Sequence, residues 1–460
     1  MKRRRFVAVS AAATCPCIAA GCLADSGRPD SSDSEDDGDD VPSGGVGDPS
    51  FGHGDAEDED DEETQDDDDD DDEERDGEDK EPERAHEDGP ILGSELEVHD
   101  ERRNGHPLWI DSEGRVYGRA SNRINVSKDW YETTETFHSF PRDHGTVDDF
   151  VQMVLVPDNG RTIVGRGGRS DKTTGQVEVL DKDKEESRVV YEFDWGRVSN
   201  SFGHAVYEDI IVIASYGRSD FEADKHPNEV ILSTDGGKSF ELILEAELHT
   251  KNAPNLHIHD VEYDPYAERI WVVVGDGGNT QIYWSDDFGT SWETIGEGGE
   301  APMLTQVVAF EDRIVFGTDG APDGIIVWDR TDPEEEPAGV EDLDREVIIE
   351  EEQDGMLMYA RRSWHVRDED GRELCLMPFG YSPMQDEWRE SVVLGTVDGH
   401  DWYELYRVDD EEALITMIIG PTSVDGERRT LVSNSNFDGG YQIEATVPEF
   451  WEDGETTEGS

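Results

Sequence analysis

Short apolar stretches recur along most of the chain, and residues that favour turns separate each stretch from the next. In residues 210–216 and 270–274, for example, Ile, Val and aromatic side chains run between positions rich in Gly, Asp and Pro. Apolar runs bounded by turn signals are typical of strands that are buried in a β-sheet. The pattern predicts an all-β domain over residues 93–452.

The predicted strands form repeated units of four. One unit has strands at residues 203–207, 210–216, 228–233 and 240–244, and the next repeats this order between residues 257 and 295. A period of roughly 50 residues with four antiparallel strands per unit is typical of β-propeller blades. We expect a β-propeller of seven four-stranded blades, with six or eight blades as the alternatives. Weaker copies of the unit begin near Pro107, Asp148, Leu304, Arg362 and Ala413.

The last predicted unit is one strand short at its outer edge. Residues 95–99, which precede the first unit, alternate in the manner of a strand. We expect this segment to complete the last blade, because pairing the two ends of the domain would remove two exposed sheet edges.

Two stretches of the chain share a spacing of Ser, Asp, Gly and an aromatic residue: Ser233–Phe240 and Ser285–Trp292. This spacing resembles the Asp-box of the sialidase-like (BNR repeat) β-propellers. Degenerate boxes occur at Ser127–Trp130 and Thr396–Trp402. The resemblance implies a propeller in which the boxes are structural turns between the third and fourth strands, on the face opposite the ligand site.

The residues of the two boxes suit such a turn. The Asp side chains can accept backbone N–H bonds, the Gly residues can adopt a positive φ, and the aromatic residues can pack between blades. The residues concerned are Ser233, Asp235, Gly237 and Phe240 in one box, and Ser285, Asp287, Gly289 and Trp292 in the other.

Several basic side chains are expected on the rim opposite the boxes. Guanidinium groups bind carboxylate or sulfate bidentately, so this rim is the predicted ligand site. The alternative is that these arginines only neutralise neighbouring carboxylates. The candidate ligand-binding residues are Arg166, Arg169, Arg218, Asp276, Asp319, Arg361, Arg362 and His365.

A histidine cluster lies at the start of a predicted strand. Strict alternation would send His257 and His259 to the same side, beside Asp260, and His204 occupies the equivalent place in the preceding unit. These four are the candidate catalytic residues, with packing, proton transfer or ligand hydrogen bonding as the roles left open. Two imidazoles alone do not make a metal site, so we predict no metal and no cofactor.

The sequence favours binding over catalysis. A sialidase of the resembled family uses an Arg-Ile-Pro motif, three arginines and a Tyr–Glu pair, whereas residues 140–142 read Phe-Pro-Arg and no such pair can be placed. We expect a monomer that binds an anionic glycan or a surface protein. The alternatives are a sialidase-like glycoside hydrolase, a polysaccharide lyase with His257 or His259 as base beside Arg218, and a chaperone-like assembly factor.

The charge of the chain is extreme. It has 39 Lys and Arg against 114 Asp and Glu, a formal net charge of −75. Residues 23–90 hold 33 acidic and 4 basic side chains, and residues 91–460 still hold 81 acidic and 31 basic ones. Concentrated salt would have to screen this repulsion, so the composition indicates a halophilic, archaeal-type protein that needs high salt for stability. Nucleic acid is excluded as a partner of the bulk surface.

The N-terminal residues resemble an export signal. Lys2 and three arginines precede a weakly apolar segment that is too short to span a bilayer. Arg3-Arg4-x-Phe6 resembles a twin-arginine signal, and residues 19–22 resemble a lipobox that ends at Cys22. We expect residues 1–22 to be a lipoprotein signal peptide, with lipidation at Cys22 and a location on the outer face of the cell membrane.

Three further segments have separate interpretations. Residues 23–92 are too acidic and too poor in apolar residues to fold, and we expect a disordered linker there, as for the acidic tail at residues 453–460. Cys375 lies in an apolar run and is expected to be a buried thiol. Asn125 begins a glycosylation sequon, Asn-Val-Ser.

Overall fold

The computed structural model describes most of residues 96–447, and every described residue belongs to one compact unit, residues 47–460. The signal peptide, Cys22, the linker and the acidic tail of the sequence predictions lie outside the described residues. The described ranges are 96–101, 106–141, 151–167, 174–181, 186–194, 197–198, 203–216, 228–246, 257–275, 280–296, 300–319, 324–348, 358–367, 371–381, 391–408, 414–423, 429–435 and 441–447.

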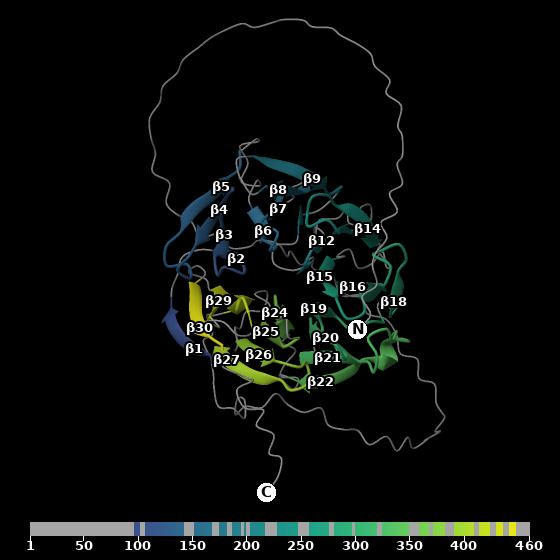
Figure 1. Ribbon diagram of the computed structural model, residues 1–460. Coiled ribbons are helices and arrows are strands. Elements are labelled where there is room, and N and C mark those ends of the chain that lie inside the picture. The colour runs from purple at the N-terminus through teal and green to yellow at the C-terminus, as the bar shows by residue number, and fades with distance from the viewer. Residues whose placement is uncertain are drawn as a thin grey trace, which may run out of the picture. The chain divides into compact units, whose positions relative to one another are not determined.

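The described residues form an all-β propeller of antiparallel sheets, most of them four-stranded, as the repeated pattern predicted. The strands fall into seven sheets, and in the first six the chain runs from the inner strands outward (Figure 1). Two of the sheets carry an additional short strand, β10 or β23, beside the four.

The first three sheets come from residues 106–246. The first contains β2 (His106–Ile110), β3 (Val116–Ala120), β4 (Arg123–Ser127) and β5 (Glu135–Ser139). The second contains β6 (Val151–Leu155), β7 (Thr162–Gly167), β8 (Gly175–Leu180) and β9 (Ser187–Glu192). The third contains β10 (Arg197–Val198), β11 (His204–Tyr207), β12 (Ile210–Tyr216), β13 (Asn228–Ser233) and β14 (Glu241–Ala246).

The next three sheets continue in chain order. The fourth contains β15 (His257–Asp264), β16 (Arg269–Gly275), β17 (Gln281–Ser285) and β18 (Glu293–Ile295). The fifth contains β19 (Leu304–Ala309), β20 (Arg313–Thr318), β21 (Gly324–Asp329) and β22 (Asp344–Ile348), with the short 3-10 helix η4 (Val340–Asp342) before β22. The sixth contains β23 (Met358–Ala360), β24 (Trp364–Arg367), β25 (Glu373–Tyr381), β26 (Ser391–Thr396) and β27 (Tyr403–Val408).

The seventh sheet joins the two ends of the domain. It contains β28 (Leu414–Ile419), β29 (Arg429–Ser435), β30 (Tyr441–Thr446) and, as its outer strand, β1 (Glu97–Glu101). The pairing of β1 with β30 is antiparallel, with Glu97 opposite Thr446. This confirms the expected closure, although the strand begins two residues later than predicted.

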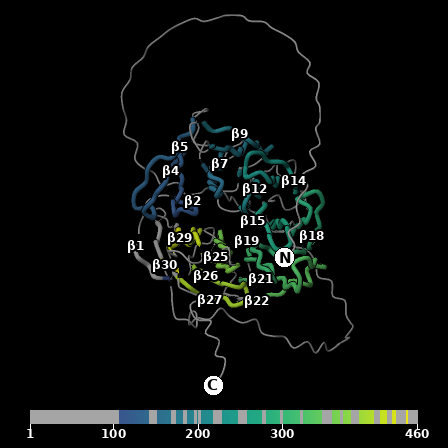
Figure 2. Tube along the Cα trace, in the orientation of Figure 1, coloured from purple at the N-terminus to yellow at the C-terminus, as the bar shows by residue number. Residues whose placement is uncertain are grey.

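Neighbouring sheets contact one another around a closed ring. The contacts run from β2 to β6, from β7 to β10, from β12 to β15, from β15 to β19, from β19 to β23 and from β25 to β28, and β28 returns to β2. The Cα trace follows the same order (Figure 2). Each sheet therefore packs between two others, as propeller blades do.

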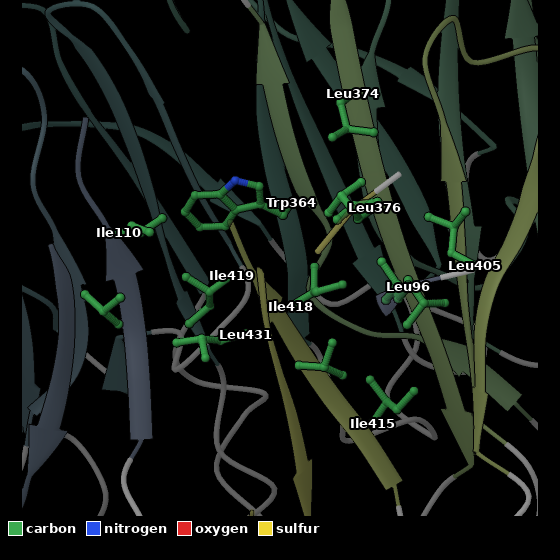
Figure 3. Close-up of a cluster of buried hydrophobic side chains, with 14 of the residues drawn as sticks. Leu96, Ile110, Trp364, Leu374, Leu376, Leu405, Ile415, Ile418, Ile419 and Leu431 are labelled. Carbon is green, nitrogen blue, oxygen red and sulfur yellow. The ribbon is translucent and has the colours of Figure 1, made fainter. Parts of the chain in front are cut away.

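The hydrophobic core lies between the sheets, in separate clusters. At the closure, Leu96 is 5% exposed and its N–H donates to the Leu405 carbonyl at 2.9 Å. One cluster contains the side chains of Leu96, which precedes β1, of Ile110 in β2 and of Ile415 in β28 (Figure 3). Cys375 belongs to the cluster between the fifth and sixth sheets, and burial raises the pKa of its thiol. The expected buried thiol is confirmed.

A β-bulge recurs near the start of the innermost strands. The register shifts once in β2, β6, β15, β19 and β28, so that one residue of the inner strand has no direct partner. A bulge bends a strand and redirects side chains. In β15 the shifted residue is His259, so strict alternation does not hold where the histidine cluster was predicted.

Candidate functional site

The Asp-box turns form closed hydrogen-bond rings. The Gly237 N–H donates to Ser233 Oγ at 2.8 Å, and the Ser239 N–H donates to Asp235 Oδ1 at 3.1 Å. Gly237 has a φ of +84°, which suits glycine. In the second box, the Gly289 N–H donates to Ser285 Oγ at 2.8 Å, and Asp287 accepts the Ser291 N–H at 2.8 Å.

The degenerate boxes make the same kind of turn. Asp129 accepts the Thr133 N–H at 2.9 Å, and the Tyr131 N–H donates to Ser127 Oγ at 2.8 Å. Asp398 accepts the His400 N–H at 2.8 Å. Bonds from the Thr133 hydroxyl and N–H lower the pKa of Asp129 to about 2. The carboxylates of Asp129 and Asp398 therefore accept hydrogen bonds from within their own turns.

The aromatic residues of the boxes pack between sheets, as predicted. Phe240 packs against the cluster between the second and third sheets. Trp292 of the fourth sheet donates from Nε1 to the Ile243 carbonyl of the third, at 2.8 Å. The boxes therefore stabilise the ring.

The strand pairings fix which residues lie at the opposite end of the sheets. In the fourth sheet, His257 pairs with Gly275 at one end of β15 and β16, and Asp264 pairs with Arg269 at the other. The Asp-box follows Ser285, which pairs with Ile270 at that second end. His259 and Asp260 therefore lie near the end of the sheet away from the box.

Arg362 connects three sheets at this end. It lies just before β24, and its Nη1 donates to the Leu108 carbonyl of β2 at 3.0 Å. Its Nη2 donates to His204 Nε2 of β11 at 2.8 Å. A guanidinium can only donate, so His204 accepts at Nε2 and carries its proton on Nδ1.

Arg362 is a buried cation with neutral partners. Its side chain lies near the Trp109 and Trp364 rings, 6.0 and 5.8 Å from the ring centroids, and the residue is 6% exposed. No carboxylate of the described residues forms an ion pair with it within 4.0 Å. Burial lowers the pKa of Arg362 to about 10, and the charge of Asp260 opposes this shift.

Asp260 is the carboxylate that acts on Arg362 from a distance. It accepts the Gly203 N–H of the third sheet and the Val307 N–H of the fifth, each at 3.1 Å. The residue is 8% exposed, and burial raises the pKa of its carboxyl to about 7 although both bonds and Arg362 pull it down. Asp260 thus joins three neighbouring sheets and is poised to change charge near neutral pH.

His259 is a packed residue with a backbone partner. Its Nδ1 lies 2.6 Å from the Leu304 carbonyl and 3.8 Å from an Asp319 carboxylate oxygen. Its ring lies against Gly275, where a Cβ atom would come within 2.2 Å of His259 Cε1. The carbonyl accepts, so Nδ1 carries a proton. The side chain of His257 lies outside the described ones.

Arg361 lies in the same segment as Arg362, but its guanidinium packs against a different side chain. Its guanidinium carbon lies 3.7 Å from the centroid of the Tyr359 ring. Burial lowers the pKa of Arg361, while Tyr359 and Asp319 raise it. Together with Arg362, this places two arginines, two histidines and two carboxylates in one group, here called the Arg362 group: the buried His259, Asp260 and Arg362 and the partly buried His204, Asp319 and Arg361.

Arg166 and His365 are not part of the Arg362 group. Arg166 forms an ion pair with Glu178 and lies over the Phe140 ring, 4.3 Å from its centroid. His365 Nε2 lies 3.2 Å from a carboxylate oxygen of Glu373. Both side chains are therefore paired within or beside their own sheets. Arg169, Arg218 and Asp276 lie outside the described residues.

Several residues of this region were not predicted. Trp109 and Trp364, with ring centroids 5.4 Å apart, flank Arg362. Gln306 accepts the Ser363 N–H at 2.6 Å and so anchors the segment that carries Arg362. The sequence signal for Trp109 and Trp364 was their place in the innermost strands of the first and sixth units. Asn125 lies in β4, between Gly118 and Thr136 of the adjoining strands.

Among the described residues, no helix is long and apolar enough to cross a membrane. In the same part of the chain, no group of three or more His, Cys, Asp or Glu side chains is arranged to hold a metal ion.

The chain matches no family model and no curated protein. Solved structures similar to it include a chain of a mitotic checkpoint complex, at 10% identity and a TM-score of 0.44, which covers 80% of this chain and 94% of the other. They also include the Trypanosoma rangeli sialidase in complex with 2,3-difluorosialic acid, at 11% identity and a TM-score of 0.39, which covers 77% of this chain. This protein spans 59% of that sialidase chain. At TM-scores below 0.5, neither similarity carries an argument about function.

Proposed function

We propose that this protein is a binding protein that holds a carboxylate- or sulfate-bearing ligand, such as an anionic glycan or an acidic surface protein, on the face opposite the Asp-boxes. The observation that supports this is the buried guanidinium of Arg362, whose described hydrogen-bond partners are a carbonyl and an imidazole. A buried charge is costly unless it is paired. An anionic ligand would supply the missing partner.

The surroundings of Arg362 favour an anion rather than a cation. Arg361 is the preceding residue, so the same segment carries a second guanidinium. His204 and His259 each hold one hydrogen bond in their neutral form and add no negative charge. Asp260 and Asp319 are the carboxylates of the same group, but Asp260 bonds to the backbone of two sheets and forms no ion pair with Arg362, so this guanidinium can still bind an anion.

Catalysis is the weaker proposal. Asp260 and His259 are the candidates for acid–base chemistry, but both hydrogen-bond to the backbone of neighbouring sheets. These contacts favour a structural role. A glycoside hydrolase or polysaccharide lyase remains the alternative that product analysis would test.

We further infer that each of the seven sheets is one blade of an Asp-box propeller. Residues 1–22 and Cys22 support export through the twin-arginine route and a lipid anchor on the outer face of the membrane, and residues 23–92 support an extended linker. Replacing Cys22 by Ser should release the protein into the medium. Retention of Cys22→Ser in the membrane fraction would contradict the anchor.

A glycan array in multimolar salt, followed by analysis of the glycans for cleavage, tests the binding proposal. Arg362→Gln should lose at least tenfold in affinity for the anionic glycans bound by the wild type, because it removes the buried charge. Lys128→Gln is the matched control, since it also removes one positive charge, from an exposed residue in a degenerate Asp-box. Melting temperatures of the variants show whether they are folded. If Arg362→Gln does not fold, Arg362→Lys is the second variant, because it keeps the positive charge. Equal binding by folded Arg362→Gln would refute the proposal, and cleaved glycans would favour the enzyme.

A further inference from the structure

Asp260 accepts hydrogen bonds from both of the segments that hold Arg362 in place. Through Gly203 it holds the residue that precedes His204, which accepts a hydrogen bond from Arg362. Through Val307 it holds the residue that follows Gln306, which accepts the Ser363 N–H. The carboxylate of Asp260 thus lies between the two segments that fix the position of Arg362.

The charge of Asp260 also acts on Arg362 directly. The two residues interact electrostatically without an ion pair within 4.0 Å, so Asp260 compensates Arg362 only in part. A ligand anion that approached Arg362 would meet the negative charge of Asp260 at close range. Two negative charges beside one buried cation repel each other, and protonation of Asp260 would remove that repulsion.

Among the described residues, Arg362 and Glu262 interact electrostatically with Asp260, and His259 precedes it in β15. His204 and Arg361 are the other titratable members of the Arg362 group on neighbouring sheets. Asp319 follows β20 and lies beside His259. The inner strand of the fifth sheet, Leu304–Ala309, contributes no titratable side chain. Burial raises the pKa of Glu262 well above its usual value, and the charge of Arg367 opposes this shift.

We propose that Asp260 is a positioning residue that couples anion binding at Arg362 to the uptake of one proton. This rests on the proposed function, because it describes how the same site is regulated. The anion binds the guanidinium, and Asp260 takes a proton from solvent and becomes a neutral carboxylic acid. For a singly charged carboxylate or sulfate ester, the net charge of the Arg362 group then stays unchanged when the ligand enters, whereas the inorganic sulfate dianion leaves it more negative by one charge.

The direction of the pH dependence follows. Free Asp260 has a pKa of about 7, and a bound anion raises this pKa further. Affinity is therefore greatest below pH 7 and falls as the pH rises above it, by at most about tenfold for each pH unit. Protonation of His204 would break its bond with Arg362 and would also make the affinity fall as the pH rises. The contributions of Asp260 and His204 to the pH dependence must therefore be separated by substitution.

Calorimetric titration of the folded protein with inorganic sulfate, at constant multimolar KCl, tests the coupling. In two buffers of different ionisation enthalpy at about pH 8, where free Asp260 is mostly ionised, the wild type should take up close to one proton per sulfate bound, and at about pH 7 roughly half a proton. The affinity of Asp260→Asn should stay flat between about pH 6 and about pH 8, while that of His204→Gln should still fall with rising pH. If Asp260→Asn does not fold, the wild-type proton count together with the pH profile of His204→Gln decides the matter, because proton uptake that persists in His204→Gln cannot come from His204.

The outcomes separate the two proposals. Sulfate binding without proton uptake, or a fall in affinity that persists in Asp260→Asn and vanishes in His204→Gln, would overturn the coupling and leave the anion site standing. If sulfate or the array glycans bind at no pH, both proposals fall.

Discussion

The two ends of the sheets use aspartate in opposite ways. Asp129 lies in an Asp-box turn near the surface, and hydrogen bonds from Thr133 lower its pKa to about 2. Asp260, at the other end, also accepts backbone N–H bonds, yet burial raises its pKa to about 7. Backbone hydrogen bonds alone therefore do not determine whether an aspartate is charged. The depth of burial decides whether an aspartate is a fixed anion that closes a turn or a group that can release its charge.

The largest effect should come from the closure, on which both ends of the sheets depend. Deleting residues 93–101 removes β1 and Leu96, exposes the edge of β30 and opens one core cluster. We expect a protein that is insoluble or that unfolds at much lower temperature in multimolar salt, as measured by circular dichroism. Leu96→Ala is the milder version and should cost about 2–5 kcal/mol of stability. A soluble deletion variant that melts like the wild type would show that the ring does not need this strand.

The next effect compares two buried carboxylates of β15. Asp264 forms an ion pair of 2.5 Å with Arg330 in which both side chains are 0% exposed, whereas Asp260 has no such partner. Asp264→Asn leaves the Arg330 charge uncompensated and should destabilise the protein by about 3–5 kcal/mol. Asp260→Asn should cost less, because it keeps one acceptor and Arg362 retains both its bonds. Denaturant unfolding would decide between them, and a larger loss for Asp260→Asn would reverse the assigned roles.

The smallest expected effect is on the loss of stability at low pH. Bonds from Ser291 lower the pKa of Asp287, as bonds from Thr133 lower that of Asp129. Such groups contribute stability above their unfolded pKa of about 4, and the contribution is lost as the pH falls through the lower folded pKa. The double variant Asp129→Asn with Asp287→Asn should therefore lose less stability than the wild type between about pH 4 and about pH 2. An unchanged slope of melting temperature against pH would mean that other carboxylates dominate acid unfolding.

The sequence predicted the fold better than the site, and the reason is physical. Alternating apolar residues and turn signals are local, so the strands, the Asp-box turns and the closing strand could be placed from the chain itself. The inner-strand bulges could not, and one of them shifts His259. The bond from Arg362 to Leu108 joins residues 254 positions apart, so no local pattern points to it. Arg166 shows the converse difficulty, since its partner Glu178 is only 12 residues away but could not be recognised among many other acids.

The most direct test of the central claim is a crystal structure of the protein grown or soaked with selenate, whose anomalous signal locates the anion. The account predicts a selenate bound to the Arg362 guanidinium, at the end of the sheets away from the Asp-boxes, in the wild type and not in Arg362→Gln. Selenate bound only around the Asp-box turns, or no change at Arg362 between the two proteins, would contradict it.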